Sequence, residues 1–193
     1  MQRPPVREGG RMGRMRNTRC GTPGAADRAK GAGRRALRFE SIDQMMAEVG
    51  RLVEAERAGL LRRAGNWTLG QALNHLAVWA EYSYTGVPLK LPFYVRWFLR
   101  LRKRKILYGA MRPGVRVPGV EGGTLATEPV PVDEALGRLR RVMNRLKTEA
   151  PTIPDTRFGW LTHDEAIAIN LRHAELHLGF LILDCAMAGG RRA

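Results

Sequence analysis

Hydrophobic residues recur every three or four positions in four stretches of the chain, residues 39–65, 68–86, 132–150 and 162–188. This is the spacing of a helix with one buried face. Three stretches open with Ser or Thr followed three residues later by Gln or Glu, which is typical of a helix start. These pairs are Ser41 with Gln44, Thr68 with Gln71, and Thr162 with Glu165. The pattern predicts four helices, and no stretch shows the alternation of a β-strand.

The connections between these helices differ in length. The first two are separated by only a few residues, which favours antiparallel neighbours. The second and third are separated by residues 87–130, and a connection of that length needs structure of its own. Its first part, "LPFYVRWFLRLRKRKILYG", can form an amphipathic helix, whereas the following segment is rich in Gly and Pro. The expected fold is therefore all-α: a four-helix bundle whose long crossover carries an extra short helix.

Charge is distributed unevenly along the 193 residues, whose net charge is +15. Residues 1–38 carry eleven Lys/Arg and two Asp/Glu, which leaves only +6 for the rest of the chain. We therefore expect a basic, Gly- and Arg-rich disordered tail at 1–38, a folded domain at 39–189 and a disordered end at 190–193. The basic run around Arg96 to Lys105 could capture an anionic substrate, an acidic membrane or nucleic acid. We interpret it instead as a solvated face of a helix whose aromatic residues pack onto the bundle.

Cysteine content and hydropathy bear on the compartment. The chain has two isolated cysteines, Cys20 and Cys185, and no secretory hydrophobic segment near its start. No run of about 18 apolar residues exists that could span a membrane. These features predict a cytoplasmic protein without a membrane span and without structural disulfides.

The candidate chemistry lies in "INLRHAELHLGFLILD", where His173 and His177 are four residues apart on one helical face. We expect Asn170, and further along the helix Asp184, on the same face. His75 lies in the second helix, on a face that also carries Gln71, Trp79 and Tyr82. The fourth histidine, His163, follows the Thr162 cap, and we expect it to be exposed.

Histidines at this spacing could hold a metal ion. Neutral imidazole is a common ligand of Zn, Ni and Fe, and three such ligands leave coordination positions open for a substrate. Two histidines four apart can equally be hydrogen-bonded core residues, and the spacing alone favours that plainer interpretation. The residue after His173 is Ala174, so the zinc-protease motif HExxH is absent.

Two longer motifs carry a family resemblance. "GNWTLGQALNHLAVWAEYS", followed about a hundred residues later by "LRHAELHLGFL", resembles the DinB-like superfamily of metal-binding four-helix bundles. The stretches from Trp67 to Leu76 and from Phe158 to His177 are similar to a branch known as a domain of unknown function. The resemblance covers about residues 39–185. It implies a divalent metal held by His75, His173 and His177, and some relatives are transferases or isomerases that use low-molecular-weight thiols.

Two hypotheses about function follow. The first is a metal-dependent thiol transferase or hydrolase that acts on a small molecule of unknown identity, with Gln71, Trp79, Tyr82 and Asn170 around the metal and with no identified catalytic residue. The second is a non-catalytic binding or scaffold protein that uses its basic surface for anionic partners. The sequence contains no recognised motif for specific nucleic-acid binding. Such bundles can form homodimers, although no sequence feature decides this.

Overall fold

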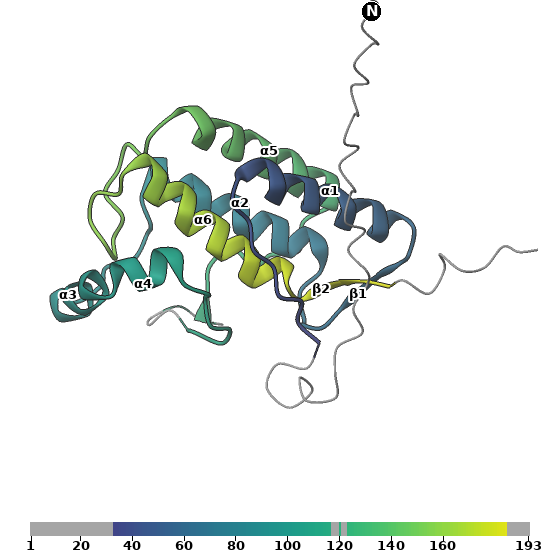
Figure 1. Cartoon of the computed structure of the whole chain (residues 1–193), viewed down its shortest axis with the longest axis horizontal. Coiled ribbons are helices and arrows are strands. Elements are labelled where there is room, and N and C mark those ends of the chain that lie inside the picture. The colour runs from purple at the N-terminus through teal and green to yellow at the C-terminus, as the bar shows by residue number, and fades with distance from the viewer. Residues whose placement is uncertain (1–32, 117–119, 121–122, 185–193) are drawn as a thin grey trace, which may run out of the picture.

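The computed structural model describes residues 33–116, 120 and 123–184, and these contain six helices and two short strands (Figure 1). The elements are α1 (Ile42–Arg57), β1 (Leu61–Arg63), α2 (Leu69–Thr85), α3 (Phe93–Leu101), α4 (Lys103–Tyr108), α5 (Val132–Thr148), α6 (His163–Leu178) and β2 (Leu181–Leu183). The protein is mostly helical, as the hydrophobic spacing predicts. In the same residues, no helix is long and apolar enough to cross a membrane.

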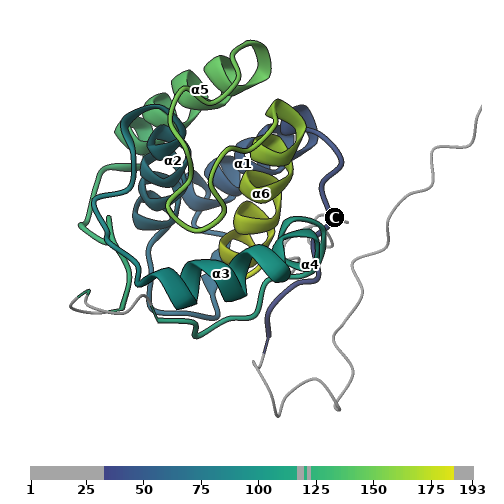
Figure 2. The same ribbon diagram turned by 90° about the vertical axis from the view of Figure 1, so that its left-hand side faces the viewer.

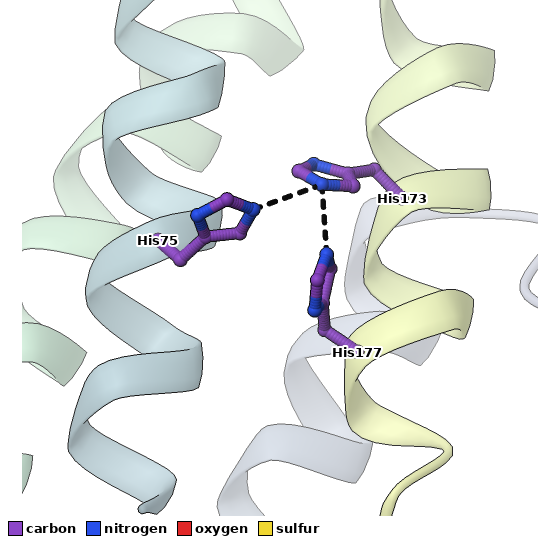
Figure 3. A group of neighbouring side chains, drawn as sticks. All are labelled: His75, His173 and His177. Carbon is purple, nitrogen blue, oxygen red and sulfur yellow. Dashed lines mark hydrogen bonds between the residues drawn. The ribbon is translucent and has the colours of Figure 1, made fainter. Parts of the chain in front are cut away.

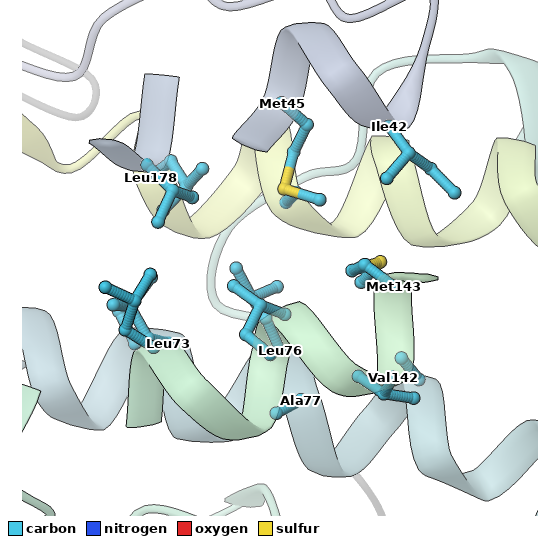
Figure 4. Close-up of a cluster of buried hydrophobic side chains, with 14 of the residues drawn as sticks. Ile42, Met45, Leu73, Leu76, Ala77, Val142, Met143 and Leu178 are labelled. Carbon is cyan, nitrogen blue, oxygen red and sulfur yellow. The ribbon is translucent and has the colours of Figure 1, made fainter. Parts of the chain in front are cut away.

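The hydrophobic core lies between the four longest helices, α1, α2, α5 and α6 (Figure 4). Helices α2 and α5 run parallel. The start of α2 at Gly70 adjoins Val130 just before α5, and at the other end the Tyr84 hydroxyl donates to the Glu149 carbonyl at 2.9 Å. Only the long crossover between α2 and α5 permits this direction, because a short loop would make them antiparallel.

Side-chain caps start most of these helices as the sequence predicts. Both Thr68 and Thr162 form complete capping boxes, with Gln71 and Glu165 respectively. The Ser41 hydroxyl accepts from the backbone N–H of Gln44, but the Gln44 side chain accepts from the N–H of Glu40 instead. Helix α5 begins after Pro131 without a side-chain cap. Each capping contact stabilises a helix start by about 1 kcal/mol.

Two predicted helix ends are wrong. Helix α1 stops at Arg57 rather than near Gly65, because Gly59 turns the chain at a φ of +68°. Helix α6 stops at Leu178 rather than near Ala188. The residues after each helix pair instead as the antiparallel strands β1 and β2, with Leu61 opposite Leu183. The partners are about 120 residues apart, so no local pattern indicates this strand pair. Residues 185–193, including Cys185, lie outside the described residues.

The crossover contains two short helices, α3 and α4, separated at Arg102, rather than one (Figure 2). Helix α4 is fixed to α6 by Leu107, which is fully buried in a second apolar cluster with Phe158 and Ile169. The expectation that the aromatic residues of the basic segment pack onto the other helices is wrong. Phe93 is 81% exposed and Trp97 is 64% exposed.

Candidate metal centre

Three histidines from two helices converge inside the protein (Figure 3). His75 projects from α2 toward α6, where His173 and His177 are one helical turn apart. The Nε2 atom of His173 lies 3.2 Å from Nε2 of His75 and 3.0 Å from Nε2 of His177. One potential ligand atom from each ring lies within 4.8 Å of the other two. The spacing in the sequence and the packing of α2 against α6 together produce this cluster.

The protonation of His75 is fixed by its surroundings. Its Nδ1 atom lies 2.8 Å from the carbonyl oxygen of Leu125, in the last part of the crossover. A carbonyl oxygen can only accept a hydrogen bond, so Nδ1 carries the proton and donates. The lone pair of neutral His75 is then on Nε2, directed at the other two histidines.

Hydrogen bonds alone satisfy the cluster poorly. The Nε2 atom of His173 is close to two other Nε2 atoms, but a neutral imidazole has at most one Nε2 hydrogen to donate. A shared cation would satisfy all three lone pairs. Tetrahedral bonds of about 2.0–2.1 Å to one ion place two ligand nitrogens about 3.3 Å apart, near the two distances observed. The donor set therefore fits a single transition-metal ion.

All three imidazoles are kept neutral, the form that binds metals. Burial lowers the pKa of His75 to about 4, although its bond to Leu125 opposes the shift. Burial, together with the neighbouring His75 and Arg34, lowers the pKa of His177 to about 3. For His173 the pKa is well below its ordinary value, chiefly through burial and then through the other two histidines. Protons therefore do not compete for these nitrogens near neutral pH.

Two tryptophans wall the cluster. The Trp67 ring stacks on His177, with centroids 4.9 Å apart and planes 4° from parallel, and it meets His75 edge-on at 4.8 Å. Trp79 also contacts His75 and His173, with ring centroids 5.9 and 5.6 Å apart. The indole N–H of Trp79 is buried and, among the described residues, has no hydrogen-bond partner.

The histidines line a cavity of about 920 Å³, within the size range of small-molecule sites. The crossover covers this cavity, since Val95, Phe98 and Leu99 of α3 and Ile106 of α4 contribute to its wall. The wall is mainly apolar. Its charged side chains are almost all basic, namely Arg102, Lys105, Arg112, Arg116 and Arg157, with the single carboxylate of Asp155.

Sequence reasoning missed Arg157, which lies beside the histidine cluster. Its guanidinium is 5.5 Å from the centre of the Trp79 ring and forms a salt bridge to Asp155 at 2.7 Å. Burial alone would raise the pKa of Asp155, but Arg157 and the backbone N–H groups of Arg157 and Phe158 outweigh it and lower the pKa. In the sequence, Arg157 directly precedes Phe158, where the second stretch of family resemblance begins, and this is the only signal that points to it.

The other candidates are divided between the cavity and its surroundings. Trp79, Tyr82 and Asn170 line the cavity, and burial raises the pKa of the Tyr82 hydroxyl. Gln71 is committed elsewhere: its amide accepts from Thr68 in the capping box and donates to the carbonyl oxygen of Thr127 at 2.8 Å.

Two further expectations are wrong. His163 is half-buried and hydrogen-bonds to the carbonyl oxygen of Leu146 at 2.6 Å, where solvent exposure was expected. Asp184 follows β2 and is exposed, because α6 ends before it and no longer directs it along the histidine face.

Fold and site together define a helical protein with a three-histidine cluster at the wall of a large cavity. The chain belongs to the family described as protein of unknown function (DUF1569), whose model matches residues 31–183. No curated protein and no solved structure matches the chain. The family match covers every element described above.

Proposed function

We propose that this protein is a DinB-like four-helix bundle that binds one divalent transition metal, Zn, Ni or Fe, through His75, His173 and His177. The observation that carries the proposal is the convergence of three neutral imidazole rings, one buried and two half-buried, at the wall of a large cavity. Three nitrogen ligands leave positions open on the ion, as in catalytic rather than structural sites.

The activity that this arrangement supports best is that of a metal-dependent transferase or hydrolase. A bound ion would supply Lewis-acid polarisation and would lower the pKa of a coordinated water or low-molecular-weight thiol. The chain itself holds His75 in one tautomer through Leu125 and packs Trp67 and Trp79 against the imidazole rings. The apolar wall and its excess of basic groups favour a largely apolar small molecule with an anionic group.

Metal content tests the first part of the proposal. The full chain, produced without a histidine tag, is expected to contain about one transition-metal ion per molecule by mass spectrometry. His173→Ala should remove it, whereas His163→Ala, which deletes the histidine outside the cluster, should not. A metal content that His173→Ala leaves unchanged would overturn the proposal.

A cobalt-substituted protein tests the second part. Replacing the native ion by Co²⁺ gives a visible spectrum that reports the coordination number. A low-molecular-weight thiol that binds the ion should add a sulfur-to-cobalt charge-transfer band, lost in His173→Ala. If added thiols leave the Co²⁺ spectrum unchanged while small carboxylates change it, a thiol-transferase activity is excluded. A metal-dependent hydrolase activity then remains as the proposal.

A further inference from the structure

Helix α3 displays five large apolar side chains to solvent. They are Phe93 (81% exposed), Tyr94 (62%), Trp97 (64%), Phe98 (52%) and Leu101 (67%), referred to below as the α3 face. No residue of α3 is buried, although the helix has nine residues. A cluster of exposed apolar side chains of this kind marks a surface that binds a protein, a membrane or a ligand.

The α3 face has a defined place on the helix. At about 100° per residue its five side chains project within an arc of about 140°. Arg96 and Arg100 border that arc on one edge. Phe98, at the opposite edge, also lines the cavity, as do Val95 and Leu99, which point away from the arc. One side of α3 therefore belongs to the candidate site, and the other side faces outward without a partner in the described structure.

The surroundings of the α3 face are strongly basic. Residues 82–120 contain nine Lys or Arg and no Asp or Glu. Lys103 is paired with Glu165 at 2.7 Å, but Arg96, Arg100 and Arg104 form no ion pair with any described residue. These guanidinium groups, which no carboxylate of the described residues neutralises, favour the binding of an anionic partner.

Helix α3 is held in position by an apolar cluster on its inner side. Leu107 of α4 is buried against Phe158 and Ile169, and Leu99 of α3 packs on the same cluster. Helix α3 lies at one side of the molecule (Figure 2), so the α3 face is a fixed feature of the surface.

We propose that α3 docks on the surface of an anionic lipid membrane, with the α3 face in the interface and the arginines among the headgroups. Aromatic residues beside Arg on a short amphipathic helix suit the boundary between headgroups and acyl chains. Leu101, at the centre of the exposed arc, offers nothing for base stacking, and the charges lie at the edge of the arc; both points disfavour nucleic acid. A second copy would bring like charges together across a two-fold axis.

Co-sedimentation of the full chain with vesicles tests the docking. Binding to phosphatidylcholine vesicles that contain phosphatidylglycerol is expected to exceed binding to pure phosphatidylcholine at least tenfold at low salt. Phe93→Ser/Trp97→Ser keeps the charge and should weaken binding about tenfold. Arg96→Gln/Arg100→Gln should weaken it and reduce its salt dependence. Arg140→Gln/Arg141→Gln removes the same charge from exposed positions on α5 and should change binding by less than about twofold.

All these variants retain the basic residues 1–38, so any contribution of that segment is common to them. Equal vesicle binding by Phe93→Ser/Trp97→Ser and wild type would overturn the proposal in favour of charge alone. A dimer in light scattering that this variant dissociates would assign the α3 face to a second copy and would also overturn it. Unchanged circular dichroism of the variant, expected for exposed positions, confirms that folding is retained.

Discussion

Helices α2 and α3 are both rich in aromatic and aliphatic residues, yet they have opposite surroundings. Ten of the 17 residues of α2 are buried, and its polar His75 is only 1% exposed. None of the nine residues of α3 is buried. Hydrophobic spacing predicts a helix in both places, but it does not tell whether the same chain covers the apolar face.

The difference lies in what each helix packs against. Helix α2 is enclosed by α1, α5 and α6, so its polar groups need internal partners: His75 has Leu125 and His173, and Asn74 accepts from Arg138 at 3.0 Å. Helix α3 rests on the rest of the molecule along one narrow side only. Buried polar groups in α2 and exposed apolar groups in α3 are therefore complementary signs of function, one inside the protein and one at its surface.

The sharpest test of this contrast removes one leucine from each helix. Leu73 of α2 is fully buried, and Leu73→Ala is expected to lower the free energy of unfolding by about 2–5 kcal/mol through lost burial and the cavity left behind. Leu101 of α3 is 67% exposed, and Leu101→Ala should change the free energy of unfolding by less than about 0.5 kcal/mol. Urea unfolding of both variants measures this, and similar costs would mean that the α3 face is covered in solution.

The burial of His75 should make the stability of the protein depend on pH. The pKa of His75 is about 4 in the folded protein, against about 6.5 in an unfolded chain. Between these values the unfolded chain binds a proton that the folded protein does not, so lowering the pH favours unfolding. The stability present above pH 6.5 is lost as the pH falls toward 4, by up to about 3 kcal/mol for this group.

Urea unfolding of the metal-free protein at a series of pH values measures this effect. His75→Gln has no group that titrates at this position, so its stability should decline less steeply over the same range. Identical pH dependence of the two proteins would show that His75 is not held neutral by burial.

Two glycines should respond in opposite directions to alanine. At Gly70, an added Cβ would lie 2.0 Å from the backbone oxygen of Val130, so Gly70→Ala must push α2 away from the start of α5. We expect Gly70→Ala to lower the free energy of unfolding by about 1–3 kcal/mol. Gly50 in α1 has open space around it, and Gly50→Ala should raise the free energy of unfolding by about 0.5–1 kcal/mol. Thermal unfolding of the two variants checks the signs, and equal shifts would contradict the close packing at Gly70.

Local sequence signals predicted the helix starts and the site better than the helix ends. A capping pair such as Thr68 with Gln71 acts within one turn, so its spacing is visible in the sequence. The end of α6 depends on the pairing of Leu181 with Arg63, which are far apart in the chain. The three histidines are an intermediate case: the i, i+4 pair is local, whereas the addition of His75 from a facing helix rests on expected helix packing and on the resemblance.

The position of the crossover could not be predicted. Whether Trp97 packs inward or faces solvent depends on how α4 attaches to α6 through Leu107 and Ile169, which is a tertiary contact. The same applies to Arg157, because its approach to Trp79 requires the turn closed by the paired backbones of Asp155 and Gly159. Neither of these tertiary contacts can be predicted from the composition of the chain or from its hydrophobic periodicity.

The smallest expected effect concerns the start of α2. The Thr68 hydroxyl accepts from the backbone N–H of Gln71 at 3.2 Å and completes a capping box, whereas α3 begins after Pro92 with no side-chain cap. Thr68→Ala leaves that N–H without its side-chain acceptor and should cost about 1 kcal/mol in urea unfolding. Thr68→Ser keeps the hydroxyl and should cost only a few tenths of a kcal/mol, so a similar loss in both variants would assign the effect to the methyl group and not to the cap.

The same variant should affect the helix that carries His75. In Thr68→Ala the first turn of α2 should fray, which hydrogen exchange would detect as faster exchange of its backbone amides. Exchange in α3, which has no side-chain cap to lose, should stay unchanged.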